Sequence, residues 1–126
     1  MLHKKMAQAL NEQINKEMYS AYLYMSMSAY SNKVGLKGFA NWFMVQFHEE
    51  MFHAMKLYEY VQRQGEEVRL DTIKAPPAEF SSQLDMFTQT LAHEQYITSS
   101  INELMELAIT KKDHATQIFL EWYITE

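Results

Sequence analysis

The sequence predicts an all-α protein in which four helices form a bundle with one long crossover. Apolar residues recur in alternating steps of four and three along four separate segments, which is the spacing of one helix face. Only 3 Gly and 2 Pro occur in 126 residues. Both prolines, Pro76 and Pro77, lie between Gly65 and Phe80, in a segment that cannot be helical. One domain, residues 1–126, is expected, because this length supports one core but not two.

The first helix is expected over about residues 5–31 and the second over about 36–64. Residues 32–35 predict a tight turn between them, and Gly65 predicts a left-handed cap that ends the second helix. Their expected core-facing stripes are Leu10, Ile14, Glu17, Ala21 and Tyr24 in the first helix, and Phe39, Phe43, Gln46, Glu50, His53, Leu57 and Tyr60 in the second.

The third helix is expected over about residues 82–110, and the fourth starts near Asp113. Ser82 with Asp85 has the Ser-x-x-acid pattern of a helix start, and Asp113 is a good N-cap. The expected stripes are Leu84, Phe87, Leu91, Glu94, Thr98, Ile101, Met105 and Ala108 in the third helix, and Ala115, Phe119, Trp122 and Glu126 in the fourth.

The crossover can extend over roughly 50 Å, enough to run the whole length of a bundle. The second and third helices are therefore expected to run parallel, in a known four-helix topology. The fourth helix is expected to be less than half as long as the others. That would leave an apolar groove exposed beside it, so we expect a partner to cover the groove in an oligomer or a swapped assembly.

Three carboxylates, those of Glu17, Glu50 and Glu94, lie on apolar stripes, where ionised groups need a partner or a metal. His53 follows Glu50 by three residues and shares its face. Counted from Val34 in the first turn, Glu17 and Glu50 are level to within about one 1.5 Å rise. Since like charges this close would otherwise force protonation, the four residues predict a divalent cation site.

The ligand types favour hard or borderline ions over a structural zinc site, because no Cys is present. Two metals bridged by Glu50 fit the number of ligands better than one. Di-iron carboxylate bundles carry a Glu-x-x-His step on two helices, and this chain shows one such step, Glu50 to His53. A fourth-helix ligand is expected near position 130, and the sequence ends at Glu126.

The bulk properties exclude several other classes of partner. A net charge of -5 gives no nucleic-acid footprint. No apolar run resembles a signal peptide or a membrane span, and the lack of Cys excludes disulfides, so a cytoplasmic protein is expected. Trp122 is expected to pack in the core. The other histidines lack an acidic partner on a core stripe and are expected at the surface; they are His3, His48, His93 and His114.

Over its whole length the chain resembles the non-haem ferritins of bacteria and archaea. The resembling segments are residues 10–24, 38–43 and 119–123, the Pro-Pro crossover, and His93-Glu94-Gln95. The resemblance implies a ferritin-like bundle with a ferroxidase centre. The resemblance implies that Glu17, Glu50 and His53 bind a first iron and that Glu50 and Glu94 bind a second. It also implies that Glu49 and Glu126 bind an accessory third iron and that Tyr24 lies beside the site.

The resemblance also implies the activity and the assembly. Paired Fe(II) would be oxidised by dioxygen or hydrogen peroxide, and the ferric product would be stored in a 24-subunit shell. Members of the family complete the fourth helix and add a fifth. Against that pattern this chain is expected to be C-terminally truncated, with its fourth helix cut short and its fifth helix absent.

Other interpretations stay open from the sequence. A rubrerythrin-like di-iron peroxidase or oxidase would share the bundle, although no Cys-rich electron-transfer segment is present. A non-catalytic helical scaffold would follow if missing ligands left the metal site incomplete. A DNA-protecting miniature ferritin is disfavoured by the acidic charge balance. For Tyr24, a hydrogen bond to a ligand carboxylate and a redox role are equally compatible with the sequence.

Overall fold

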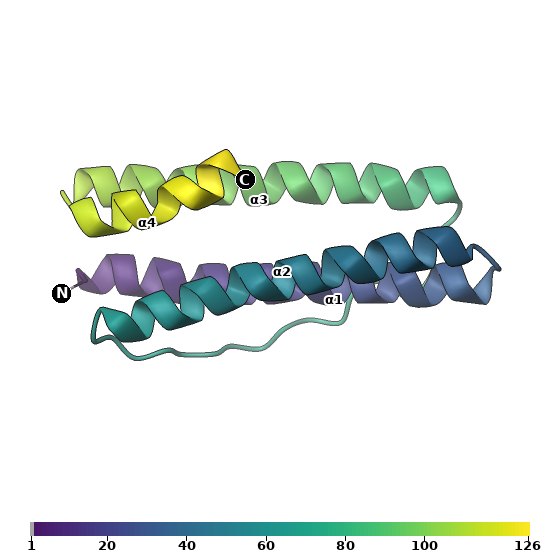
Figure 1. The fold of residues 1–126 in the computed structure, drawn as a ribbon, viewed down its shortest axis with the longest axis horizontal. Helices are drawn as coiled ribbons and strands as arrows, with labels where there is room; N and C mark the ends of the chain where they lie inside the picture. The colour runs from purple at the N-terminus through teal and green to yellow at the C-terminus, as the bar shows by residue number, and fades with distance from the viewer. Residues whose placement is uncertain (1) are drawn as a thin grey trace.

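The computed structural model describes residues 2–126, which form four helices and no strand. Their order along the chain is α1 (Lys4–Lys33), α2 (Lys37–Arg63), α3 (Gln83–Thr110) and α4 (His114–Thr125). The ribbon in Figure 1 shows that α2 and α3 run in one direction while α1 and α4 run in the other. The predicted four-helix bundle with a short fourth helix is therefore confirmed.

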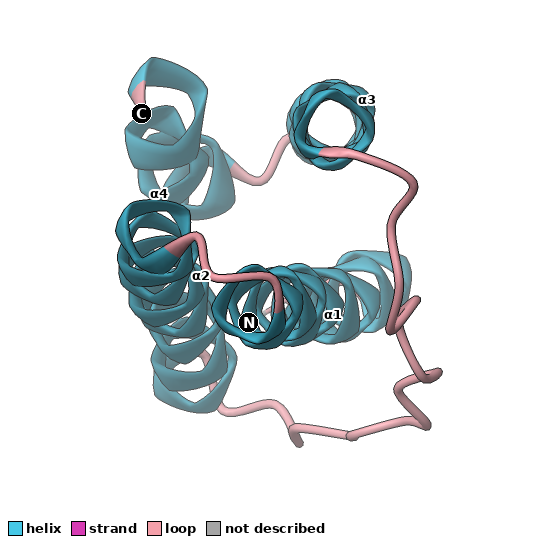
Figure 2. Cartoon of the chain, turned by 90° about the vertical axis from the view of Figure 1, so that its right-hand side faces the viewer, coloured by secondary structure: helices cyan, strands magenta, loops and turns pink. Residues whose placement is uncertain are grey.

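The end-on view shows the four helices around a common interior (Figure 2). α1 packs against both α2 and α3, and α4 packs against α3. The crossover runs along the outside of the bundle for much of its length (Figure 1). No helix of the described residues combines the length and the hydropathy needed to traverse a membrane.

Two asparagines of α1 hold the crossover in place. Asn11 accepts from the backbone N–H of Arg69 at 2.9 Å and donates to the carbonyl of Glu67 at 3.1 Å. Asn15 donates to the backbone carbonyls of Asp71 and Thr72, at 3.2 and 3.1 Å. These side chains give hydrogen-bond partners to an extended segment that has no strand beside it.

The predicted helix boundaries follow from local backbone chemistry. Gly35 and Gly65 adopt left-handed φ values of 82° and 79°, which end α1 and α2. Ser82 accepts from the backbone N–H of Asp85 at 3.0 Å and caps α3. Asp113 accepts from the backbone N–H of Thr116 at 3.0 Å and caps α4.

The core consists of two apolar clusters, and both draw on α1, α2 and α3. The larger cluster also takes Leu120 and Tyr123 from α4. The smaller cluster consists of Leu23, Tyr24, Met27, Phe43, Phe80 and Met86.

The stripes expected on α2, α3 and α4 need correction. Phe39 of α2 was expected in the core but is 38% exposed. Leu84 and Leu91 were expected in the core but are 76% and 61% exposed. Thr98, on the same expected stripe, is exposed as well. Phe87 of that stripe is half-buried and packs against Phe43 of α2.

In α4 the buried stripe lies one residue later than expected. It consists of Thr116, Leu120 and Tyr123, while Ala115 is exposed and Phe119 and Trp122 are half-buried.

Candidate metal centre

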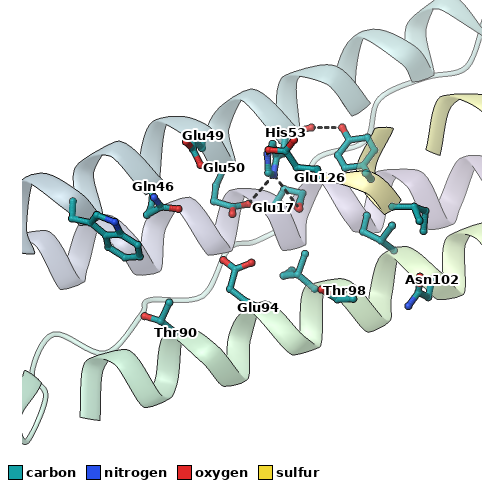
Figure 3. A pocket seen from close by; sticks show the side chains of 15 residues that line it. Glu17, Gln46, Glu49, Glu50, His53, Thr90, Glu94, Thr98, Asn102 and Glu126 are labelled. Atoms are coloured by element: carbon teal, nitrogen blue, oxygen red, sulfur yellow. Dashed lines mark hydrogen bonds and ion pairs between the residues drawn. The ribbon is translucent and has the colours of Figure 1, made fainter. Parts of the chain in front are cut away.

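Three helices direct carboxylates and an imidazole into one cavity (Figure 3). Glu17 comes from α1, Glu50 and His53 come from α2, and Glu94 comes from α3. The cavity has a volume of about 340 Å³, and all four residues line it. Glu17 and Glu50 are 1% and 5% exposed, so both carboxylates lie in the interior.

His53 directs one ring nitrogen at both buried acids. Its Nδ1 lies 3.3 Å from Glu50 Oε2 and 4.0 Å from Glu17 Oε1. One ligand atom from each of the three residues falls within 4.8 Å of the other two. A single cation placed among them could therefore contact all three, and Nδ1 is the nitrogen that would bind it.

The buried carboxylates lack the hydrogen bonds that would make them stable on their own. Both oxygens of Glu17 and Oε2 of Glu50 are buried and have no hydrogen-bond partner. Burial, and then repulsion from Glu50, raises the pKa of Glu17 to about 8. Burial also raises the pKa of Glu50. A bound cation would pair with these buried carboxylate oxygens, which have no other partner. The residues present therefore fit a metal.

The protonation of His53 reflects the same crowding of acids. Burial by itself lowers its pKa, but contact with Glu50 and the charge of Glu17 more than compensate and raise it. The imidazole thus serves as a partial counter-charge to the acids in this structure. A cation would take over that function, and His53 would then bind it as the neutral ring.

Glu94 lies across the cavity from this group and is held by a tyrosine. The hydroxyl of Tyr24 donates to Glu94 Oε1. Burial, together with the hydrogen bond to Glu94, raises the pKa of Tyr24, which keeps the phenol protonated as a donor. Figure 3 shows Glu94 facing Glu50 from α3. The structure brings Glu94 to the same cavity, although not within the tight group of three.

The two accessory residues lie at the mouth of the cavity. Glu126 Oε1 lies 3.8 Å from Nε2 of His53, and the Glu126 side chain is 48% exposed. Glu49 also lines the cavity and is exposed. Both carboxylates are available to a hydrated cation at the entrance.

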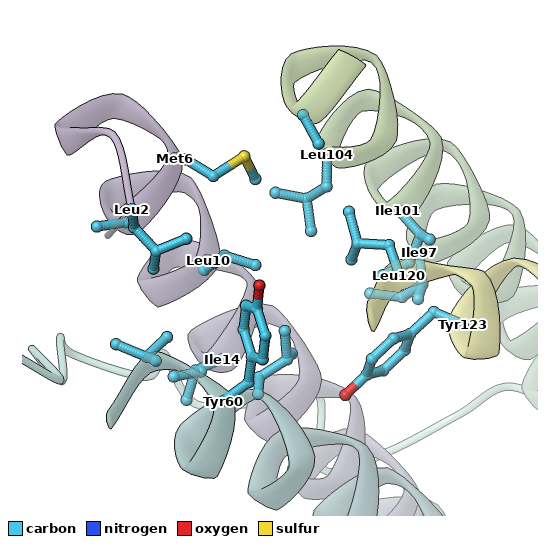
Figure 4. Packing of buried hydrophobic residues seen from close by; sticks show 14 residues of the cluster. Leu2, Met6, Leu10, Ile14, Tyr60, Ile97, Ile101, Leu104, Leu120 and Tyr123 are labelled. Atoms are coloured by element: carbon cyan, nitrogen blue, oxygen red, sulfur yellow. The ribbon is translucent and has the colours of Figure 1, made fainter. Parts of the chain in front are cut away.

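One wall of the cavity is apolar, on the side of the larger apolar cluster. Ile97, Ile101 and Tyr123 line the cavity and also belong to that cluster. Figure 4 shows them among apolar side chains from α1, α2, α3 and α4. Water is therefore excluded from one side of the carboxylates, which strengthens their attraction to a cation.

One histidine prediction is wrong. His93 was expected at the surface, but it is half-buried, and its Nε2 lies 2.6 Å from the hydroxyl of buried Ser20. Burial lowers the pKa of His93. Its partner belongs to another helix, so the stripe of α3 alone gave no sign of it. The other three, His3, His48 and His114, are exposed as expected.

No site role was expected from the sequence for Gln13, Gln46 or Tyr123, although Gln46 was expected on the core-facing stripe of the second helix. Gln46 and Tyr123 line the cavity, and Gln13 is buried one helical turn before Glu17. A signal existed for the glutamines, because each precedes a buried glutamate by four residues and so shares its face. Tyr123 gave no such signal.

The comparisons with known proteins agree with the fold described above. Residues 7–126 match the family model described as ferritin-like domain. The bacterial non-heme ferritin of Staphylococcus epidermidis is 48% identical over 126 residues, which are all of this chain and 76% of that protein. The corresponding protein of Campylobacter jejuni is 45% identical and is covered to 75%.

A solved structure agrees as closely. The open pore ferritin from the hyperthermophilic archaeon Archaeoglobus fulgidus superposes with a TM-score of 0.98 at 47% identity. The match covers 99% of this chain and 77% of that one. The fold, the family model and the identity to named ferritins over the whole of this chain therefore agree, and the chain belongs to the ferritin-like family.

Proposed function

We propose that this chain is an iron-storage ferritin whose buried carboxylates form a ferroxidase centre. The observation that carries the proposal is the set of unpartnered oxygens on Glu17 and Glu50, next to Nδ1 of His53. Carboxylate oxygens with one imidazole suit iron in both oxidation states. The relatives named above as ferritins support iron as the metal.

Each residue has a specific role in the proposed reaction. Glu17, Glu50 and His53 bind the first Fe(II), and Glu50 also bridges to a second Fe(II) held by Glu94. Tyr24 fixes the Glu94 carboxylate through its hydroxyl. Anionic oxygen ligands stabilise Fe(III) more than Fe(II), so the same residues favour oxidation.

The pairing of the two irons matches the chemistry of the oxidants. Two Fe(II) supply the two electrons that, with two protons, convert dioxygen to hydrogen peroxide. The same two electrons and two protons convert hydrogen peroxide to two waters. A paired site thus avoids the one-electron reduction of oxygen to radicals. The apolar wall that includes Ile97 and Ile101 limits the escape of any radical that forms.

Glu49 and Glu126 would bind an accessory third iron at the mouth of the cavity. From there Fe(III) would pass into a mineral held by a homo-oligomeric shell in the cytoplasm. Exposed apolar side chains support such an assembly, because partner subunits would cover them. They include Trp42 of α2, with Leu84 and Leu91 of α3.

Anaerobic titration with Fe(II), followed by addition of dioxygen, tests the proposal. Saturable binding of two Fe(II) per chain and oxygen consumption coupled to ferric mineral are expected. The matched control carries Glu50→Ala with His53→Ala and should lose both. Binding no stronger than in this control would support a scaffold without catalysis. Turnover of peroxide with an external reductant and no mineral would instead support a rubrerythrin-like enzyme.

A further inference from the structure

A chain of hydrogen bonds leads from the surface of α1 toward Glu17. Lys16 Nζ lies 2.9 Å from Ser100 Oγ, and Ser100 Oγ lies 2.6 Å from Gln13 Oε1. Gln13 and Ser100 are 1% and 4% exposed, so this link between α1 and α3 is buried. Lys16 is held at the outer end, where its ammonium also lies 5.6 Å from the centre of the Tyr96 ring.

The chemistry of the three groups fixes the direction of this chain. A lysine ammonium has donors and no acceptor, so Ser100 Oγ accepts from Lys16. The one hydrogen of the Ser100 hydroxyl then goes to Gln13, which must present its carbonyl oxygen to receive it. The NH₂ group of Gln13 is consequently the end that faces away from Ser100.

That NH₂ group is left without a partner beside the metal centre. Gln13 Nε2 is buried and makes no hydrogen bond, and neither oxygen of Glu17 makes one. Gln13 precedes Glu17 by four residues, so the two side chains share one face of α1. The pair thus presents a buried donor and a buried acceptor, both unused, on the same face of one helix.

We propose that Gln13 is a positioning residue for the metal centre. Clamped by Ser100, its NH₂ group takes one oxygen of the Glu17 carboxylate when a cation binds. The other oxygen stays directed at the cation shared with Glu50 and His53. This inference rests on the proposed function, because it names a residue that prepares Glu17 to bind metal. A carboxylate ligand held by such a partner loses less orientational freedom on binding.

The choice of a neutral amide has a chemical reason. A lysine or arginine in the place of Gln13 would pair with Glu17 and compete with the metal for its charge. An amide donor holds the carboxylate without neutralising it. Lys16 at the far end polarises the chain and strengthens the donor while its charge stays outside the site.

Anaerobic Co(II) titration of the whole chain, followed by visible absorption, tests this role without any redox step. Gln13→Leu removes the amide at similar volume and should weaken the first Co(II) by about 10–100-fold. Gln13→Glu keeps an acceptor for Ser100 but replaces the donor that faces Glu17 with a second acceptor. It should therefore weaken binding of the first Co(II) as well. Ser100→Ala should cause a smaller loss, and Ser100→Thr, which keeps the hydroxyl, should restore affinity.

Unfolding of the metal-free protein separates positioning from a structural role. The double variant Gln13→Leu, Ser100→Ala replaces both partners with apolar groups, which is close to neutral for stability. It should unfold near the wild-type temperature and still bind Co(II) weakly. The matched control is Ser28→Ala, which removes another buried α1 hydroxyl, bonded to the carbonyl of Ala40 at 2.7 Å outside the cavity. It should unfold at a lower temperature than wild type and keep its Co(II) affinity.

Two results would overturn the inference, and they are distinguishable. If wild type binds Co(II) and Gln13→Leu and Gln13→Glu bind it equally tightly with the same spectrum, Gln13 does not position Glu17 and the proposed function survives. If wild type shows no saturable Co(II) binding above the Glu50→Ala, His53→Ala control, the metal centre itself fails and this inference fails with it.

Discussion

The hydroxyl of Tyr123 on α4 donates to the backbone carbonyl of His53 on α2 at 2.6 Å. The same ring lies edge-on to the His53 imidazole, with centroids 6.0 Å apart. Through this contact the short α4 is tied to the residue whose side chain faces both buried acids. The stability of α4 and the orientation of His53 are therefore coupled.

Removing that hydroxyl should loosen α4. Tyr123→Phe is expected to lower the free energy of unfolding by about 1–2 kcal/mol, because the His53 carbonyl loses its second partner and the ring keeps its packing. Thermal unfolding measures this. The matched control is Tyr58→Phe, on α2 and half-buried, which should change stability by less than about 0.5 kcal/mol. Equal losses in the two variants would show that the contact contributes nothing of its own.

The metal-free protein should lose stability as pH rises from about 5 to about 8. The pKa of Glu17 is raised from 4.5 to about 8 on folding, so the folded state holds a proton that the unfolded state releases over that range. The loss has an upper limit of about 5 kcal/mol. Glu50 and His53 have raised pKa values and act in the same direction.

Denaturant unfolding in the presence of a chelator, at several pH values, measures this slope. Glu17→Gln should flatten it, because the amide carries no charge at any pH. His93 acts in the opposite direction: its pKa is lowered from 6.5, so its contribution is lost as pH falls. Stability that rises toward pH 8 in wild type would contradict the burial of an ionisable Glu17.

A bound divalent metal should stabilise the fold by mass action. At a free Co(II) concentration of about 100 times its dissociation constant, the gain is about 2.7 kcal/mol. At a fixed free Co(II) concentration the gain should be larger at high pH, because binding requires deprotonated Glu17 and neutral His53. Calorimetry with and without Co(II) measures it, and the variant Glu50→Ala with His53→Ala should show no gain.

Tyr24→Phe should affect the two metal positions differently. It removes the donor to Glu94, so binding of the second ion should weaken by about tenfold while binding of the first ion stays near wild type. Stepwise calorimetric titration separates the two. Tyr30→Phe, also on α1, serves as the control, because Tyr30 lies outside the cavity. Equal weakening of both ions would place Tyr24 in a general structural role.

Local patterns predicted most of the fold. Helix periodicity, the caps at Ser82 and Asp113, and the left-handed glycines each depend on a few neighbouring residues, so one sequence reveals them. The level heights of Glu17 and Glu50 followed from counting residues on either side of one turn. Three of the predicted site residues consequently meet in the structure.

What the sequence could not reveal depends on contacts between helices. Periodicity along α3 indicates that Leu84 and Leu91 lie on one apolar face, but it does not indicate whether another helix covers that face. α4 has only 12 residues, too few to fix its rotation by periodicity. There the buried position is Thr116, because its hydroxyl lies 2.9 Å from that of Tyr60 in another helix. The clamp on Gln13 likewise depends on Ser100, far away in the chain.

The division of the cavity between two hairpins has a consequence for the order of assembly. Glu17, Glu50 and His53 all belong to the hairpin of α1 and α2, whereas Glu94 arrives with α3. Contacts within a hairpin join residues that are close in the sequence, so they form early, before more distant segments dock. Refolding followed by pulsed hydrogen exchange, with and without Co(II), would reveal protection of α1 and α2 ahead of α3. On that order of events, a nascent chain can capture its first ion while its second half is still unstructured.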